Sequence, residues 1–414
     1  MVTEHVPGSR SAAVGLWVGA GSRDETALQA GAAHFLEHVL FKRTPTRTAA
    51  QIAEQVDAVG GELNAFTTKE YTCFYAHVLD RDARLAVDVV TDVALRGLCR
   101  ADDIELERQV VLEEIAMRDQ DPEDLLADLL DEAMFTGHAL ARPVIGTPES
   151  VTAMNRRRIT GFHRRRYRPE KMVLAVAGNV DHDTVLRAVT EALADRTDGP
   201  TTGAATPAHP RPRRRPGVIV RDHDGEQAHL SVAVRTPGRA GEADRWPLAV
   251  LNHVLGGGLS SRLFQRVRED RGLAYSVYSA VDTYTEAGAL SVYAGCQPGN
   301  LGAVADQVSA VLDEIATGGI SETELARARG GLRGAMVLGM EDTSARMNRL
   351  GVGQLLSGRP RSLDEALGAI DAVTAEDVGA LATRLLAGPR GGVVLGPYDG
   401  PAALPGPARR LLGR

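Results

Sequence analysis

Two histidines and a glutamate interrupt an otherwise apolar segment at positions 33–40, AHFLEHVL. On a helix, His38 lies about 40° from His34 on one face, and Glu37 flanks that face about 60° to the other side of His34. Two neutral imidazoles one turn apart can both reach a zinc ion at about 2.0–2.1 Å, while the carboxylate reaches a metal-bound water. Unpaired burial of these groups would be costly, so the pattern predicts a catalytic zinc site.

The remaining ligand has to come from elsewhere in the chain, because a catalytic zinc usually takes three protein ligands and keeps a fourth position for water. An acidic helical stretch at 104–117, IELERQVVLEEIAM, supplies Glu105, Glu107, Glu113 and Glu114. Glu107 and Glu114 are seven residues apart and therefore share one helical face. Helical geometry alone does not choose among the four glutamates.

The two halves of the chain look alike, which indicates how these segments are positioned. The sequence LEHVL at 36–40 reappears as LNHVL at 251–255. Each copy follows a strand-like run and precedes alternating segments typical of paired strands, and amphipathic helical stretches come next. We therefore predict an α+β fold with two homologous domains, each a mainly antiparallel sheet with helices packed on one face. The first should span 1–195 and the second 217–414.

The second copy lacks the groups that a metal site needs. Ala249 and Asn252 stand where the first copy has His34 and Glu37, and only His253 remains. A lone histidine cannot assemble such a site, so His253 should be a packed or hydrogen-bonded side chain.

The segment 196–216 is rich in Pro, Gly, Thr and Arg and is interpreted as a linker. Its arginine run at 213–215 is expected to be solvated rather than to bind nucleic acid. The net charge of −7 and the aromatic content of 4% agree with the absence of a nucleic-acid partner.

Length and composition are typical of a globular protein with more than one domain. With 414 residues the chain is too long for one core, and its 43% hydrophobic and 24% charged residues are typical of globular proteins. No apolar stretch approaches the ~20 residues of a membrane span, so no membrane partner is expected. The N-terminus lacks a secretory pattern, and Cys73, Cys99 and Cys296 are scattered. We therefore expect neither disulfides nor a metal site made of thiolates. The expected location is the cytoplasm.

Several blocks together carry a family resemblance: VGLWVGAGSRDE, AAHFLEHVLFKRT, GGELNAFTTKEYTCFYA, ERQVVLEEI, HALARPVIGTPESV and YRPEKMVLAVAGNV. The chain resembles the pitrilysin, insulin-degrading and mitochondrial-processing peptidase family, whose zinc motif is the inverted HxxEH. This resemblance implies the LuxS/processing-peptidase-like metallohydrolase fold and one Zn²⁺ per chain. The family's third ligand ends an E-R-x-V-x-x-x-E pattern 76 residues after the second histidine, which is Glu114 here. Glu107 corresponds to a group that orients the ligands or tunes the charge of the site.

The function that the resemblance implies is a zinc-dependent metalloendopeptidase acting on short or unfolded polypeptides inside a dimer chamber. His34, His38 and Glu114 would hold the zinc, and Glu37 would take the proton of the attacking water and pass it to the departing amine.

Substrate contacts are implied in both halves. In the first half, the strand at 62–67 would pair with an extended substrate through Asn64, Ala65 and Phe66. In the second half, Arg268 and Tyr275 of SSRLFQRVREDRGLAYSVYS would contact the substrate backbone, the tyrosine hydroxyl helping to stabilise the oxyanion.

Alternatives remain open at this point. The chain could be a catalytically inactive or scaffold subunit of a heterodimeric peptidase, or a protease dedicated to maturing one leader peptide. The dimer could be a homodimer or a heterodimer with a related subunit. Relatives begin with a strand before the position of VTEHVPG, so we expect a short or incomplete first strand here.

Overall fold

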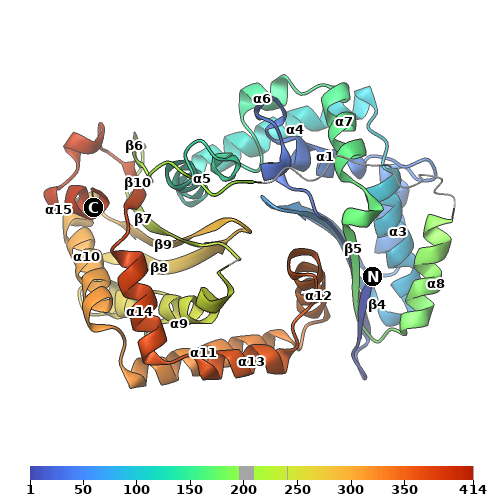
Figure 1. Cartoon of the computed structure of the whole chain (residues 1–414). Helices are drawn as coiled ribbons and strands as arrows, with labels where there is room; N and C mark the ends of the chain where they lie inside the picture. The colour runs from blue at the N-terminus through green and yellow to red at the C-terminus, as the bar shows by residue number, and fades with distance from the viewer. Residues whose placement is uncertain (195–208, 240, 414) are drawn as a thin grey trace. The chain divides into compact units, whose positions relative to one another are not determined.

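Two five-stranded sheets with the same strand order form the framework of the chain (Figure 1). The computed structural model describes residues 1–194, 209–239 and 241–413. The sheet orders are β1-β5-β2-β4-β3 and β6-β10-β7-β9-β8. In each sheet one outer pair, β1 with β5 and β6 with β10, is parallel, and the other pairs are antiparallel. The predicted α+β fold with a duplicated, mainly antiparallel sheet is confirmed.

The strands of the first sheet are β1 (Val2–His5), β2 (Ser11–Val18), β3 (Glu62–Thr67), β4 (Thr72–Leu79) and β5 (Met172–Gly178). Those of the second are β6 (Val218–Asp222), β7 (Ala228–Pro237), β8 (Ala274–Thr283), β9 (Ala287–Cys296) and β10 (Arg390–Gly396).

Helices α1 to α8 follow β2 and precede the linker: α1 (Ala32–Leu40), α2 (Ala49–Asp57), α3 (Ala83–Arg96), α4 (Ala101–Gln120), α5 (Pro122–Met134), α6 (Pro148–Thr152), α7 (Arg156–Arg166) and α8 (His182–Leu193). The later helices are α9 (Arg245–Leu255), α10 (Leu301–Gly318), α11 (Glu322–Gly339), α12 (Thr343–Ser357), α13 (Leu363–Ala372), α14 (Ala375–Leu386) and α15 (Gly406–Leu412).

The first sheet is buried on both faces, whereas the sequence predicted helices on one face only. Alternate residues of β2, such as Val14 and Leu16, point into a core shared with α1 and α3. The next residue, Trp17, packs on the opposite face against Met347 and Leu350 of α12. The run SAAVGLWV has no polar alternation, which is the sequence sign of a strand with two buried faces.

Glycines make room for Trp17 between the sheet and α12. An added Cβ would lie 2.4 Å from the indole ring at Gly15 and also at Gly351. Two glycines therefore let the largest side chain of this layer lie flat between a strand and a helix.

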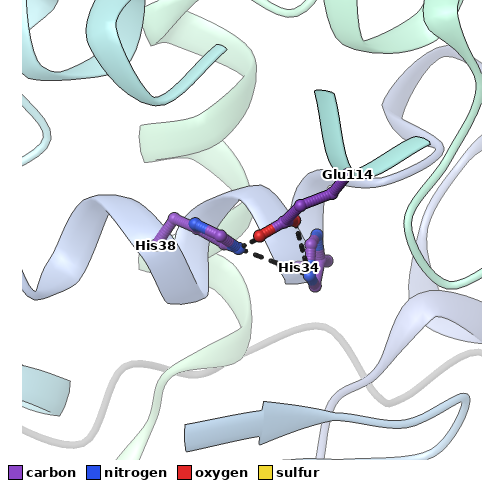
Figure 2. Close-up of side chains that lie close together, drawn as sticks. All are labelled: His34, His38 and Glu114. Carbon is purple, nitrogen blue, oxygen red and sulfur yellow. Dashed lines mark hydrogen bonds and ion pairs between the residues drawn. The ribbon is translucent and has the colours of Figure 1, made fainter. Parts of the chain in front are cut away.

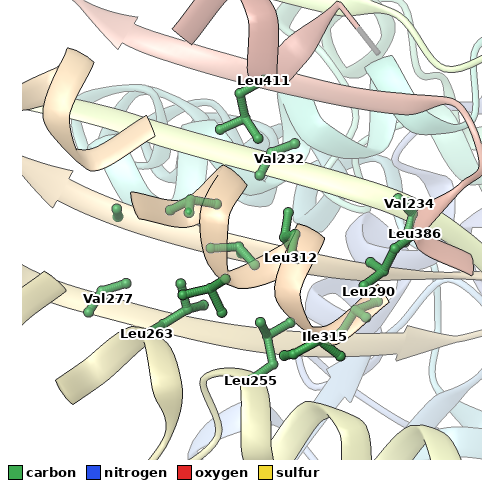
Figure 3. Close-up of a cluster of buried hydrophobic side chains, with 14 of the residues drawn as sticks. Val232, Val234, Leu255, Leu263, Val277, Leu290, Leu312, Ile315, Leu386 and Leu411 are labelled. Atoms are coloured by element: carbon green, nitrogen blue, oxygen red, sulfur yellow. The ribbon is translucent and has the colours of Figure 1, made fainter. Parts of the chain in front are cut away.

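The second sheet is built in the same way. Its first core lies between the sheet and helices that include α10 and α14, where Val232, Leu290 and Leu312 are buried (Figure 3). The opposite face packs against α5, through Leu126 and neighbouring apolar residues. Here too a strand whose residues are all buried, β10, separates two cores.

Each sheet thus takes one covering helix from the other half of the sequence. The compact units are Met1–Met117, Arg142–Ala208 and Val337–Ser362 for the first, and Arg118–Ala141, His209–Met336 and Leu363–Arg414 for the second. The predicted domain boundary separates the strands of the two sheets, while α5 and α12 belong to the unit of the opposite half.

The part of the predicted linker at 196–208 lies outside the described residues. Residues 209–216 form neither helix nor strand, and the arginines at 213–215 are exposed. Cys73, Cys99 and Cys296 are free and buried. Among the described residues, no helix has both the length and the apolar character needed to cross a membrane.

Candidate metal centre

Helix α1 has one buried apolar face and one face with polar groups. Phe35, Leu36 and Val39 are fully buried in the core of the first unit. The helix begins after Gly31, whose φ of 87° lies in the left-handed region that favours glycine. A Cβ there would lie 2.7 Å from the carbonyl oxygen of Ile145, so the helix starts where only glycine fits.

His34 and His38 project from the polar face of α1 and meet Glu114 from α4 (Figure 2). Their Nε2 atoms are 3.4 Å apart. The Oε2 atom of Glu114 is 3.4 Å from Nε2 of His38 and 3.7 Å from Nε2 of His34. Of the four glutamates left open by the sequence, the structure brings Glu114 to the two histidines.

This spacing fits one zinc ion. Ligands about 2.0–2.1 Å from a tetrahedral ion lie roughly 3.3 Å from one another, close to the three distances in this triangle. The Oε2 atom of Glu114 is buried and accepts no hydrogen bond from the residues that the structure describes. A buried acceptor without a hydrogen-bond donor, facing two imidazole nitrogens, is a donor set suited to a cation.

His34 is held in the form that binds metal. Burial, followed by the neighbouring His38, lowers the pKa of His34 from 6.5 to about 3. His34 is therefore neutral at physiological pH, and a neutral imidazole has a lone pair available for a metal.

Glu107 contacts both a metal-site histidine and the half-buried Lys42. Its Oε2 atom lies 3.2 Å from Nδ1 of His38, and its Oε1 atom lies 2.7 Å from Nζ of Lys42. A hydrogen bond from Nδ1 leaves Nε2 of His38 as the unprotonated nitrogen that faces Glu114. Lys42 compensates the charge of a carboxylate that is almost fully buried.

Glu37 lies beside the three ligands and points to a different partner. The hydroxyl of Thr67, the last residue of β3, donates a hydrogen bond to its Oε2 atom. Burial raises the pKa of Glu37, and the negative charge of Glu114 acts in the same direction. A carboxylate with a raised pKa is a better proton acceptor near neutral pH.

Comparisons with known proteins show the family of this chain. Residues 1–148 match the family "Insulinase (Peptidase family M16)", and residues 153–332 match "Peptidase M16 inactive domain". An "uncharacterized zinc protease" of Mycobacterium leprae is 56% identical over 406 residues, which cover 98% of this chain and 91% of the relative. The chain belongs to peptidase family M16.

More distant proteins are similar to this chain over nearly its whole length. The uncharacterized zinc protease YmxG of Bacillus subtilis is 38% identical over 386 residues, 93% of each chain. A protease from Helicobacter pylori has the same fold, with a TM-score of 0.87 at 21% identity over 95% of this chain and 96% of that one. A Pseudomonas fluorescens structure described as a peptidase M16 inactive domain has a TM-score of 0.85, with 21% identity over 96% of this chain and 95% of that one.

The second unit of this M16 chain carries the degenerate copy. The side chain of Asn252 accepts a hydrogen bond from Ser279, 2.7 Å away. A Cβ added at Gly331 would lie 2.6 Å from the ring of His253, so this histidine is closely packed, as the sequence indicated. The match to an inactive domain covers this region.

The predicted substrate residues lie on edge elements. Asn64, Ala65 and Phe66 are on β3, and on the side away from β4 no other described strand pairs with it. The side chain of Asn64 accepts a hydrogen bond from the amide of Ala65.

In the second unit, Arg268 and Tyr275 lie next to each other. The guanidinium of Arg268 stacks on the rings of Phe264 and Tyr275, at 4.9 and 5.1 Å from their centroids. Tyr275 is 79% exposed at the edge strand β8. The stack orders a side chain that would otherwise move freely in solvent.

Sequence reasoning missed three groups around the site. Lys42 lies four residues after His38, one further turn along the same face, which is a signal that helical spacing could have supplied. Thr67 and Glu25 reach α1 from separate segments. Their contacts depend on tertiary structure and have no local sequence signal.

Proposed function

We propose that this M16 chain is a zinc-dependent metalloendopeptidase that hydrolyses peptide bonds of short or unfolded polypeptides. The observation that carries the proposal is the convergence of His34, His38 and Glu114 into a triangle that suits one zinc ion, with Glu37 beside it. Chains of the family that serve as scaffolds have no need for this complete set.

The roles of the side chains follow from their contacts. His34, His38 and Glu114 hold the metal, which when bound supplies the Lewis acidity that activates a water and polarises a carbonyl. Thr67 occupies Oε2 of Glu37, so Oε1 takes the proton from the attacking water. The protonated Glu37 then donates that proton to the departing amine. Glu107, itself paired with Lys42, keeps His38 in the required orientation.

A pocket of about 590 Å³ opens beside Glu37 and His38 within the first unit. Half of its lining residues are apolar, among them Phe41, Ile52 and Leu63, and the other half are polar or charged. A substrate strand added to the edge of β3 would place a side chain in this pocket next to the cleaved bond. An apolar side chain at that position would be favoured because it removes apolar surface from water.

The active site is completed by groups from two chains. The stack of Arg268 on Tyr275 presents a hydroxyl and a cation that suit the substrate backbone and a developing oxyanion. We place these groups at the zinc of a partner chain, in a dimer that encloses a chamber. A mixture of Glu37→Gln and Tyr275→Phe chains should then recover activity that neither variant has alone. Absence of recovery after demonstrated subunit exchange would contradict this arrangement.

The test of the enzymatic proposal is the variant Glu37→Gln, compared with Glu113→Gln on the exposed face of α4 as a matched control. Wild type and control should contain zinc and cleave an unstructured peptide, whereas Glu37→Gln should contain zinc and lose about 10²–10⁴-fold in kcat. Cleavage that persists in Glu37→Gln would refute the role of Glu37. A zinc-loaded wild-type chain that cleaves no peptide would favour a scaffold function.

A further inference from the structure

Glu25 is a buried carboxylate at the start of the helix that carries the metal ligands. Only 5% of the residue is exposed. The amide of Gly31 donates to its Oε2 atom at 2.9 Å, and the amide of Ala33 donates to its Oε1 atom at 2.7 Å. The first amides of a helix have no partner within the helix, and Gly31 has no side chain that could accept from them. Glu25 therefore caps α1 from outside the helix.

Glu25 is itself fixed in place. The guanidinium of Arg142 donates to the carbonyl oxygen of Glu25 at 2.8 Å, and its charge attracts the Glu25 carboxylate. Next to this contact the backbones of Gly31 and Gly146 touch, since a Cβ on Gly146 would lie 2.9 Å from Cα of Gly31. The beginning of α1 is thus held between a carboxylate on one segment and a tight backbone contact on another.

Burying a carboxylate to cap a helix has a high cost in desolvation free energy. Burial raises the pKa of Glu25, although both amides and Arg142 act in the opposite direction. Helix starts elsewhere in this chain are capped by Thr48, Asn155 and Asp181, which border solvent. A buried charged group that lowers stability is expected at positions that function requires.

We propose that Glu25 is a positioning residue for the metal centre: its two amide contacts fix the first turn of α1 and so hold His34 and His38 at zinc-binding distance. The proposal rests on the metal site of the proposed function. His34 follows Ala33 directly, so a shift of the Ala33 amide also moves the first ligand. Ligands that are not held in place must be ordered when the metal binds, which lowers affinity.

The variant Glu25→Gln tests this, because it keeps the length of the side chain but turns an NH₂ group toward one of the two amides. Asp92→Asn is the matched control. Asp92 is also a buried carboxylate, and it holds Thr44, Thr46 and Arg47 rather than α1. Metal-free proteins are titrated with Co²⁺, and the affinity and visible absorption spectrum are recorded together with thermal unfolding of the metal-free form.

We expect Glu25→Gln to bind Co²⁺ about ten-fold more weakly than wild type, with an altered spectrum, while Asp92→Asn changes only the unfolding temperature. Equal affinity and spectra in Glu25→Gln and wild type would overturn the proposal. Wild-type protein that binds no cobalt would overturn the metal site itself, and this inference with it. If Glu25→Gln does not fold, amide hydrogen exchange of wild type decides: Gly31 and Ala33 should be protected, and fast exchange of both contradicts the contact.

Discussion

Acid should destabilise the metal-free chain through His34. The pKa of this residue is lowered from 6.5 to about 3 by burial and by His38, so the unfolded chain binds a proton that the folded chain does not. Stability therefore falls as the pH drops from about 6.5 toward 3 and is regained above that window. At pH 5 this single residue should cost about 2 kcal/mol of unfolding free energy relative to pH 7.

The assay is urea unfolding of the metal-free protein at pH 7 and pH 5, for wild type and for His34→Gln. Wild type should lose about 2 kcal/mol more than His34→Gln over this interval. The control is His253→Gln, which removes the second-unit imidazole that corresponds to His38 and should leave the His34-dependent loss in place. Equal losses in wild type and His34→Gln would refute the account of a buried, neutral His34.

Three further predictions concern the surroundings of the site. Glu107→Gln should weaken metal binding about 10- to 100-fold in a chelator competition, because His38 loses its charged acceptor; unchanged affinity would contradict this. Ala53→Trp, at an exposed position of α2 that lines the pocket, should narrow the pocket and lower kcat/KM for peptides with a large apolar side chain after the cleaved bond more than for peptides with alanine there. An unchanged ratio would show that the pocket does not hold that side chain. Gly351→Ala should lower the free energy of unfolding, measured in urea, by about 1–3 kcal/mol, because its Cβ would lie 2.4 Å from the Trp17 ring. A variant as stable as wild type would show that α12 adjusts freely.

The helical spacing of the sequence was sufficient to predict one face of the site. His34, Glu37 and His38 lie on one helix, and the seven-residue interval from Glu107 to Glu114 places both on one face of another. Relations within one helix follow from its fixed period, so they can be predicted before any tertiary contact is known. The repeat of LEHVL as LNHVL likewise predicted two homologous domains, and the structure gives their sheets the same strand order.

Contacts between segments far apart in sequence could not be predicted in this way. Helices α5 and α12 pack on the sheet of the opposite half, and their amphipathic patterns do not say which apolar surface they cover. Thr67 and Glu25 reach α1 from a strand end and a short loop. The continuous apolar run of β2 did carry a usable signal, because a strand with two buried faces requires a second covering layer.

The central claim is that one zinc ion on His34, His38 and Glu114 makes this M16 chain a peptidase. The most direct measurement is a titration of metal-free protein with Zn²⁺ while cleavage of an unstructured peptide is followed. The account predicts that the rate rises in proportion to added zinc and stops rising at about one ion per chain. Cleavage that is independent of zinc, or zinc uptake at one ion per chain without any cleavage, would contradict it.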